Sequence, residues 1–275
     1  MSAEKNLSEN RQPDIFIAGP PRSGTTILNQ TLCKSEYTNP MMGEAQHFFN
    51  LIQAYDSALQ QFDYKTKYYF TRDSLFQYHK NLANEYLHRI RSNFKTGTRL
   101  VLKCPGYSKY FHHIIRLIPS AQFVLIIRDP LDIVASQVVV GEKQRAASEP
   151  CDFPREFIQS MAQKVNFTYL SLLEKRELFG NKIIIIKCEN LVSDKLALAR
   201  VSDFLQLPDL IDNSKLNNSD VTDFVHDKTR AIYSPLWDKN LTSSSIGKYK
   251  DILTPEEIKT VKKASKILRD MFGYT

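Results

Sequence analysis

The sequence predicts an α/β fold in which helices cover both faces of a central parallel sheet. Short apolar runs alternate with helical patterns along the chain, and residues 14–18 and 122–127 are almost entirely apolar. A strand of a parallel sheet is buried on both faces, so its sequence is a continuous apolar run instead of an alternating one. Such sheets bind ligands just outside the carboxyl ends of their strands. Functional residues are therefore expected directly after the strands.

Local patterns place the individual elements. Strands are expected where short apolar runs end at glycine, proline or charged residues: 14–18, 99–103, 122–127 and 181–186. Helices are expected where apolar residues recur at helical spacing: 24–33, much of 48–94, 107–118, 131–140, 156–178 and 197–205. A last helix, 254–271, opens with Thr254 as N-cap, Pro255 and Glu257. The stretches 141–154 and 213–245 are predicted to be loops and candidate lids over an acceptor.

Length and composition favour a flexible tail, 1–12, followed by one domain, 13–275. The net charge of +7 suits an anionic ligand. Basic runs interleaved with aromatic residues are lacking, which argues against a nucleic-acid partner. The apolar runs are far shorter than the roughly 20 residues of a membrane span. The four cysteines form no C-x-x-C pair, which favours reduced thiols in a cytoplasmic protein, and the oligomeric state stays open.

A glycine-rich loop follows the first predicted strand. Gly19-Pro20-Pro21-Arg22-Ser23-Gly24-Thr25-Thr26 has G-x-x-x-x-G spacing and leads into a predicted helix. Backbone N–H groups and the positive end of the helix dipole bind anions at such a turn. Thr25 stands where nucleotide kinases and ATPases carry a lysine for the β- and γ-phosphates. A sulfuryl group, with one negative charge fewer than a terminal phosphoryl and no bridging metal, fits this loop better.

A second anion site is predicted around the strand 122–127. Arg128 directly follows this strand, and Ser136 lies two turns into the next helix, so both can converge on one phosphate. Alone, Arg128 suits an ion pair with Asp132 equally well; together with the glycine-rich loop, phosphate binding is favoured. Asp129 is expected to cap a helix or form an ion pair, so the sequence offers no clear magnesium ligand after a strand.

The two motifs together resemble the sulfotransferases that use 3′-phosphoadenosine 5′-phosphosulfate (PAPS). Residues 21–26 resemble the 5′-phosphosulfate loop of that family, and 127–136 resemble its 3′-phosphate motif, in the same order and at similar separation. Weaker similarity runs through 187–192, 204–208 and 246–249. The resemblance implies a P-loop-containing nucleoside triphosphate hydrolase-like three-layer α/β/α fold, of the bacterial and tyrosylprotein-sulfotransferase branch. It also implies a PAPS co-substrate, no metal, and a small-molecule or peptide acceptor.

The resemblance assigns donor-binding residues beyond the two motifs. The family usually has tyrosine beside the adenine where this chain has Cys188. An Arg-Lys-Gly element of some members is replaced here by 242–245, so serine hydroxyls such as Ser244 are expected at the 3′-phosphate. The resemblance places Gly247 and Lys248 in the same binding region. The full expected donor site is Arg22, Ser23, Gly24, Thr25, Thr26, Arg128, Ser136, Cys188, Ser244, Gly247 and Lys248.

The resemblance also indicates the catalytic groups. Lys103, at the end of a predicted strand, resembles the catalytic lysine of the family, and its ammonium suits charge on the leaving oxygen. Phenol-type members carry a histidine base two residues later, where this chain has Pro105. Glu44 resembles the glutamate base of tyrosylprotein-type members and is expected to be buried against an apolar acceptor pocket. His47 is the alternative base.

Other polar and aromatic residues are less informative. His112 and His113 are interpreted as surface or packing residues. Phe48, Phe49 and Tyr55, with aromatics of 62–86, are candidates for the acceptor pocket, although helical aromatics more often form the core. Two functions compete with sulfuryl transfer to a hydroxyl or amine: a P-loop small-molecule kinase and a non-catalytic nucleotide- or anion-binding scaffold.

Overall fold

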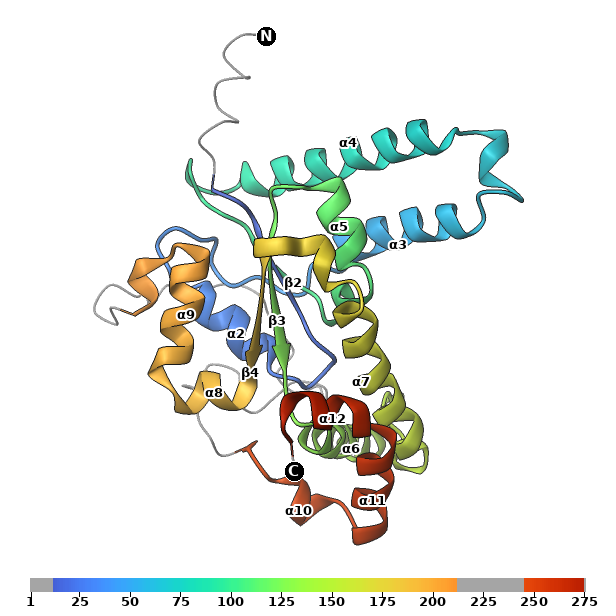
Figure 1. The fold of residues 1–275 in the computed structure, drawn as a ribbon, viewed down its shortest axis with the longest axis vertical. Helices are drawn as coiled ribbons and strands as arrows, with labels where there is room; N and C mark the ends of the chain where they lie inside the picture. Colours follow the sequence, from blue (N-terminus) through green and yellow to red (C-terminus); the bar gives the residue numbers. More distant parts are fainter. Residues whose placement is uncertain (1–11, 212–244, 275) are drawn as a thin grey trace.

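The computed structural model describes residues 12–211 and 245–274. Its sheet has four parallel strands: β1 (Ile15–Ala18), β2 (Val101–Lys103), β3 (Gln122–Ile127) and β4 (Ile183–Lys187). Their spatial order is β2-β1-β3-β4. Ile15 pairs with Val101 on one side and with Gln122 on the other, and Phe123 pairs with Ile183. Because every pairing is parallel, all four strands end at the same edge of the sheet (Figure 1).

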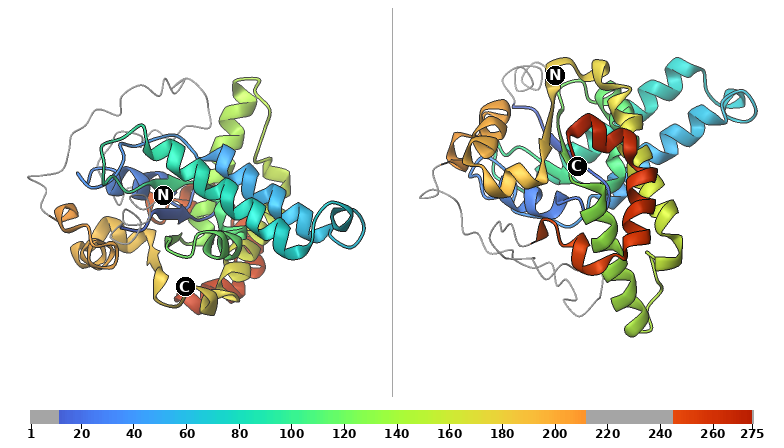
Figure 2. Two further views of the ribbon diagram at one scale, coloured as in Figure 1. Left: turned by 90° about the horizontal axis from the view of Figure 1, so that it is seen from above. Right: turned by 60° about the horizontal axis from the view of Figure 1, so that its bottom comes forward.

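Helices form a layer on each face of this sheet, as the sequence predicts. In the views of Figure 1 and Figure 2, α2, α8 and α9 cover one face, while α5 and α7 cover the other. The helix bounds are α2 (Thr25–Leu32), α3 (Gln46–Gln60), α4 (Arg72–Arg91), α5 (Phe111–Leu117), α6 (Pro130–Ala146), α7 (Ile158–Leu173), α8 (Cys188–Ser193), α9 (Lys195–Leu205), α10 (Tyr249–Ile252), α11 (Pro255–Ala264) and α12 (Lys266–Phe272). The predicted three-layer α/β/α class is therefore confirmed.

Each strand supplies both core layers because successive side chains point to opposite faces. In β1, Ile15 and Ile17 pack with residues of α2, α8 and α9, whereas Phe16 packs on the other face. The Phe16 ring lies 5.6 Å from that of Phe48 and 5.9 Å from that of Phe123, measured between centroids. All of these side chains are fully buried, and each contributes about 1.5–3 kcal/mol by leaving water.

The aromatic region 48–94 forms a helical hairpin, α3 and α4, that projects from the body of the molecule (Figure 1). Phe48 and Tyr55 on α3 are buried in the main core, with exposed fractions of 0% and 4%. They hold the hairpin to the sheet, as helical aromatics of a core do, and a role for them at the acceptor stays a prediction. The apolar periodicity of this region reflects the packing of α3 and α4 against the core.

The segment predicted as one candidate lid, 141–154, is part of the packed body instead. Helix α6 continues to Ala146. The chain then folds back so closely that a Cβ atom on Gly141 would lie 2.1 Å from the carbonyl oxygen of Phe153. The buried Gln144 side chain donates to Asp152 at 2.6 Å and accepts from its backbone N–H at 2.9 Å. These long-range contacts lengthen the helix, and local polarity gives no sign of them.

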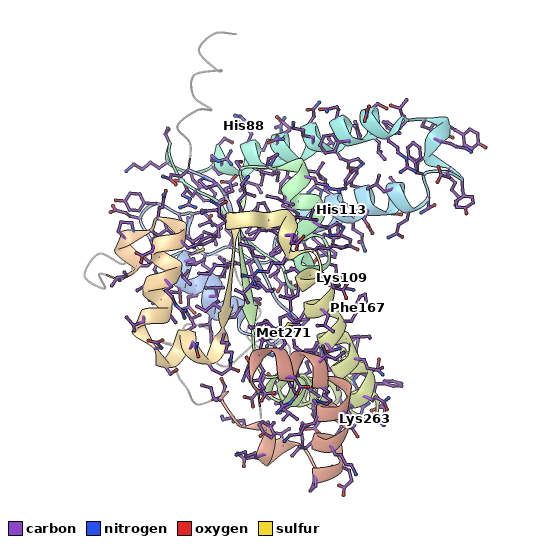
Figure 3. The ribbon with its side chains drawn as sticks, viewed as in Figure 1. His88, Lys109, His113, Phe167, Lys263 and Met271 are labelled. Atoms are coloured by element: carbon purple, nitrogen blue, oxygen red, sulfur yellow. The ribbon has the colours of Figure 1, made fainter. Side chains whose placement is uncertain are left out.

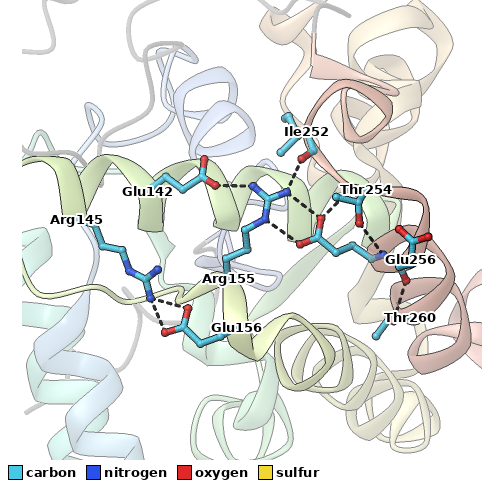
Figure 4. Close-up of polar contacts among 9 residues, drawn as sticks. Glu142, Arg145, Arg155, Glu156, Ile252, Thr254, Glu256 and Thr260 are labelled. Carbon is cyan, nitrogen blue, oxygen red and sulfur yellow. Dashed lines mark hydrogen bonds and ion pairs between the residues drawn. The ribbon is translucent and has the colours of Figure 1, made fainter.

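The carboxyl-terminal helix begins as predicted but is broken. Thr254 and Glu257 form a capping box at the start of α11. At Ser265 the helix ends and α12 begins. The buried Ser265 hydroxyl donates to the carbonyl of Val261 at 2.7 Å, a contact of the kind that bends helices. Figure 4 shows how the start of α11 is held to the body by Arg155.

Arg155 is the centre of this polar network. Its guanidinium donates to both carboxylate oxygens of Glu257, at 2.8 and 2.9 Å, and to the carbonyl of Ile252 at 2.9 Å. A third partner, Glu142 on α6, lies at 2.6 Å. Beside it, Arg145 pairs with Glu156. The network fixes 252–257 against α6, and thereby the chain that leads from residue 245 to α11.

Four predictions concern the chain termini, a candidate lid, the cysteines and membrane spans. The predicted tail, apart from Gln12, and the second candidate lid, 213–245, apart from Ser245, lie outside the described residues. All four cysteines are unpaired thiols. Within the described ranges, the structure has no helix with the length and apolar character needed to cross a membrane.

Candidate functional site

The predicted functional residues meet at the carboxyl edge of the sheet. Lys103 ends β2, the glycine-rich loop 19–24 follows β1, Arg128 follows β3, and Cys188 follows β4. The strand order β2-β1-β3-β4 therefore places the loop in the middle, with Lys103 on one side and Arg128 on the other. This edge is where ligands bind in parallel sheets.

The glycine-rich loop has the geometry of an anion cradle. Arg22 and Gly24 have positive φ angles, 75° and 102°, and Gly24 is the N-cap of α2. No side chain caps this helix, so the N–H groups of its first turn face the loop without an intrahelical partner. Thr25 is buried and Thr26 is half-buried at the same turn. A Cβ atom on Gly24 would lie 2.7 Å from the Cys188 sulfur, so glycine is required here.

Ser23 adds a hydroxyl inside the loop. Its side chain is fully buried, and its Oγ has no hydrogen-bond partner among the described residues. The Tyr169 hydroxyl lies close by but donates its proton to the carbonyl of Ile126, at 3.1 Å. The Ser23 hydroxyl therefore lies inside the loop, where it can donate to a bound anion.

The loop is in direct contact with the second predicted anion site. Arg22 Nε donates to Ser136 Oγ at 3.1 Å. Arg128, 8% exposed, donates through Nη1 to the carbonyl of Arg22 at 3.1 Å. Burial lowers the pKa of Arg22, and the positive charge of Arg128 lowers it further. Two guanidinium groups gathered in a largely buried place favour an anionic ligand between them.

Three hydrogen bonds that the sequence interpretation did not predict complete this region. Arg128 Nη2 donates to the carbonyl of Ser245 at 2.6 Å. Asp132, 3% exposed, accepts from the backbone N–H of Gly247 at 2.8 Å. It also accepts from the N–H of Tyr249, at 3.2 Å. Asp132 thus anchors the turn at 245–249 instead of pairing with Arg128, and no local pattern in the sequence indicates this role.

Gln137 is a further tether to the loop, because its side-chain amide donates to the carbonyl of Pro21 at 3.1 Å. Its position, one residue after Ser136, could have suggested proximity to the ligand. Of the other predicted donor-binding residues, Lys248 is exposed at the anchored turn and Ser244 lies outside the described residues.

Cys188 and its neighbours support the loop from the side of β4. The Cys188 thiol is 6% exposed, and burial raises its pKa to about 11, so it stays protonated. Glu189 accepts from the backbone N–H of Asp129 at 2.9 Å and from the Tyr274 hydroxyl at 3.0 Å. Asp129 caps α6 through the N–H of Leu131 and pairs with the Arg269 guanidinium, which confirms the capping and ion-pairing roles expected for it.

Lys103 and Glu44 form an ion pair beside the loop. Lys103 Nζ lies 2.7 Å from Glu44 Oε1. The Lys103 side chain is 4% exposed, but that of Glu44 is 46% exposed, so the expectation of a buried Glu44 is wrong. The reason is that Glu44 lies on an irregular segment before α3, where the adjacent Ala45 N–H donates to the Lys103 carbonyl at 2.9 Å. Its carboxylate can therefore meet a ligand from solvent.

His47 is directed elsewhere. It is exposed, and its ring stacks on Tyr86 of α4 with centroids 5.3 Å apart. The structure gives it no contact with Lys103 or Glu44 among the interactions of the described residues.

A cavity of about 620 Å³ lies at the opposite edge of the sheet. It is lined by residues preceding β1 and β3 and by α4, among them Asp14, Glu85, His88 and Arg91. Arg91 and Asp14 are paired there. Since Lys103, the glycine-rich loop and Arg128 lie at the carboxyl edge, we assign the candidate site to that edge and not to this cavity.

Comparisons with known proteins agree with this fold. A model of a family described as "Sulfotransferase family" matches residues 13–212. The sulfotransferase domain from the curacin biosynthetic pathway superposes with a TM-score of 0.61 at 19% identity, covering 97% of this chain and 99% of that one. The sulfotransferase domain of the Synechococcus PCC 7002 olefin synthase gives 0.55 at 15% identity, covering 94% and 96%. Sulfotransferase STF9 from Mycobacterium avium gives 0.52 at 12% identity, covering 98% and 79%.

A sequence relative from Aquifex aeolicus (strain VF5) is described as an uncharacterized protein. It is 28% identical over 126 residues, which are 44% of this chain. The match spans only 16% of that relative's length.

Proposed function

The chain belongs to the sulfotransferase family, and from that premise we propose that it transfers the sulfuryl group of PAPS to a hydroxyl or amine of a small molecule or peptide. The observation that carries the proposal is the hydrogen bond from Arg22 to Ser136. It joins the loop expected at the 5′-phosphosulfate to the helix expected at the 3′-phosphate. One doubly phosphorylated adenosine can then bridge both.

The residues present fit this donor. The uncapped first turn of α2 and the Ser23 hydroxyl suit the 5′-phosphosulfate. Arg128 and Ser136 suit the 3′-phosphate, with the turn 245–249 closing over it through Asp132. Cys188, whose sulfur packs against Gly24, stands where the family usually has a tyrosine beside the adenine. The adenine contacts are therefore expected to differ from the usual family arrangement.

The Lys103–Glu44 pair lies where the sulfuryl group would meet its acceptor. When bound, PAPS supplies a sulfur atom that forms a bond to the acceptor oxygen or nitrogen while its bond to the phosphate oxygen breaks. Glu44 accepts the proton that the acceptor loses, through a carboxylate that is open to solvent. Lys103 places an ammonium at the oxygen on which negative charge develops. The products are the sulfated acceptor, adenosine 3′,5′-bisphosphate and the proton on Glu44.

The kinase alternative needs a magnesium ligand and a lysine in the loop. Thr25 occupies the lysine position. Among the described residues, Asp129 and Asp132 follow β3 but are already engaged, by Arg269 and by two backbone N–H groups respectively. The site therefore favours sulfuryl transfer. We further propose that 13–275 is one catalytic domain working in the cytoplasm, where its unpaired cysteines stay reduced.

A thermal-shift comparison tests the proposed function. Adenosine 3′,5′-bisphosphate without metal is expected to raise the Tm of the protein, because a ligand that binds only the folded state stabilises it. ATP with Mg²⁺, and AMP, are expected to give much smaller shifts because neither carries a 3′-phosphate. A preference for ATP with Mg²⁺ would favour the kinase, and no response to any nucleotide would favour the scaffold.

Arg128→Ala is expected to raise the KM for PAPS about 10- to 100-fold, because hydrogen bonds to a charged group contribute about 1.5–3 kcal/mol each. Arg128→Lys should not restore affinity, since an ammonium cannot bond the Arg22 and Ser245 carbonyls and a phosphate with the geometry of a guanidinium fork. Arg89→Ala, at an exposed arginine of α4, is the matched control. Steady-state kinetics with an unchanged KM in Arg128→Ala would remove Arg128 from the donor site.

A further inference from the structure

Three side chains with metal-binding chemistry meet where α3 passes α5, away from the residues of the proposed reaction. Asp56 comes from α3, and His112 and His113 come from the first turn of α5. One ligand atom from each lies within 4.8 Å of the others. His113, labelled in Figure 3, lies close to the junction of the two helices. The sequence interpretation treated both histidines as surface or packing residues.

We propose that Asp56, His112 and His113 form a binding site for one divalent transition-metal ion of the zinc type. Two imidazoles and a carboxylate are ligands that zinc takes in proteins, with water in the remaining position. Bonds of about 2.0–2.1 Å in a tetrahedral site separate the ligand atoms by roughly 3.4 Å. The ligand atoms are already within 4.8 Å of one another, so side-chain rotations that move them by about an ångström would complete the site.

His113, the more buried of the two histidines, has one ring nitrogen without a hydrogen-bond partner among the described residues. His113 is 5% exposed, and its Nε2 lies 2.9 Å from Asp56 Oδ1. Its other ring nitrogen, Nδ1, is buried and has no partner among the described residues. If His113 served only as a hydrogen-bond partner of Asp56, its Nδ1 would make no interaction with the described residues. The His112 ring packs on the His113 ring with centroids 4.0 Å apart, so both imidazoles reach the same small volume.

One feature of the site opposes a cation. The Lys175 ammonium lies 3.5 Å from His112 Nε2. Lys175 is exposed, so its side chain can turn into solvent when an ion binds. The Lys175 charge then weakens metal binding without preventing it. Removal of this charge should therefore strengthen metal binding, an effect expected of a metal site and not of a simple hydrogen-bonded cluster.

A bound ion would brace the helical hairpin. The segment with Glu44 leads directly into α3, and the Asp56 ligand lies on that helix, while both histidines belong to α5. Tyr55 packs beside His113 with ring centroids 5.2 Å apart, so one flank of the site is aromatic. The ion would tie the hairpin to the body through this point, independently of donor or acceptor binding.

The test is titration of the metal-free full-length protein with Zn²⁺, followed by calorimetry and by the Tm. We expect one Zn²⁺ per chain and a rise in Tm. Asp56→Asn and His112→Ala should each weaken affinity at least about tenfold, because even the partners of metal ligands are typically worth 10- to 100-fold. His112 is only half-buried, so its replacement avoids the folding risk of changing His113.

Two matched variants make the result decisive. Lys175→Gln should tighten Zn²⁺ binding severalfold, and His88→Ala, at an exposed histidine of α4, should leave it unchanged. Absence of one-to-one binding overturns the proposal. Binding that survives both Asp56→Asn and His112→Ala, or that is lost in His88→Ala, places the ion elsewhere and overturns it as well. Neither result bears on the donor site, which the nucleotide titration tests separately.

Discussion

Glu44→Gln is expected to lower kcat about 10²- to 10⁴-fold, the usual contribution of a positioned general base. Glutamine keeps the shape of the side chain and an oxygen that can accept from Lys103 Nζ, now 2.7 Å from Glu44 Oε1. The buried Lys103 therefore retains a partner, and the fold should be preserved. The amide cannot take a proton from the acceptor. The loss should therefore appear in kcat, with little change in the KM for PAPS.

His47→Gln is the control for this experiment, because His47 is the alternative base on the same stretch of chain. Its ring stacks on Tyr86, and it is expected to keep activity within a few-fold of the unchanged protein. Initial rates at saturating PAPS decide between the two residues. Full activity in Glu44→Gln, or a collapse of kcat in His47→Gln alone, would reverse the assignment.

Lys103→Met is expected to lower kcat about 10²- to 10³-fold, the typical cost of removing one group that stabilises charge in the transition state. Methionine fills much of the volume of a side chain that is 4% exposed, so no large cavity arises. The Glu44 carboxylate, 46% exposed, stays hydrated when its partner is removed. We expect the Lys103→Met protein to lose rate while its Tm stays almost unchanged. A clearly lower Tm would instead indicate that the substitution disturbs the structure.

Lys109→Met provides the matched lysine control, since Lys109 is exposed six residues further along the chain. The double variant Glu44→Gln with Lys103→Met should lose less than the product of the two single losses, because paired residues act as a unit. Strict multiplicativity would mean that the two groups act at separate steps. A Lys103→Met protein with normal kcat would remove the lysine from the reaction.

The outcome for the fold shows which sequence patterns are reliable. β3 has the predicted bounds because 122–127 is an isolated apolar run, and the start of α11 has the predicted capping box. Predictions failed at two helix ends. Close packing of Gly141 against the Phe153 backbone accompanies the longer α6, and the last helix is divided at Ser265. Neither feature is indicated by the hydrophobic periodicity of the sequence.

The outcome for the candidate site follows the same division. The loop 19–24 and Arg128 were predictable because turn chemistry after a buried strand is a local property. Asp132 and Gln137 were missed because their partners are backbone groups more than a hundred positions away: Gly247 for Asp132, Pro21 for Gln137. The convergence of Asp56, His112 and His113 likewise has no local signature, because α3 and α5 must pack before these side chains meet.

By itself, the sequence determined that strands alternate with helices, that a glycine-rich loop without lysine follows the first strand, and that an arginine follows the third strand. Hydrophobic runs and turn residues encode these features within a few positions. Only the tertiary structure decided that β1 lies between β2 and β3, which places the Lys103–Glu44 pair and the Arg22–Ser136 contact on opposite sides of one loop. Strand order and long-range polar contacts depend on how whole faces pack, and packing is a property of the assembled core that no short stretch of residues contains.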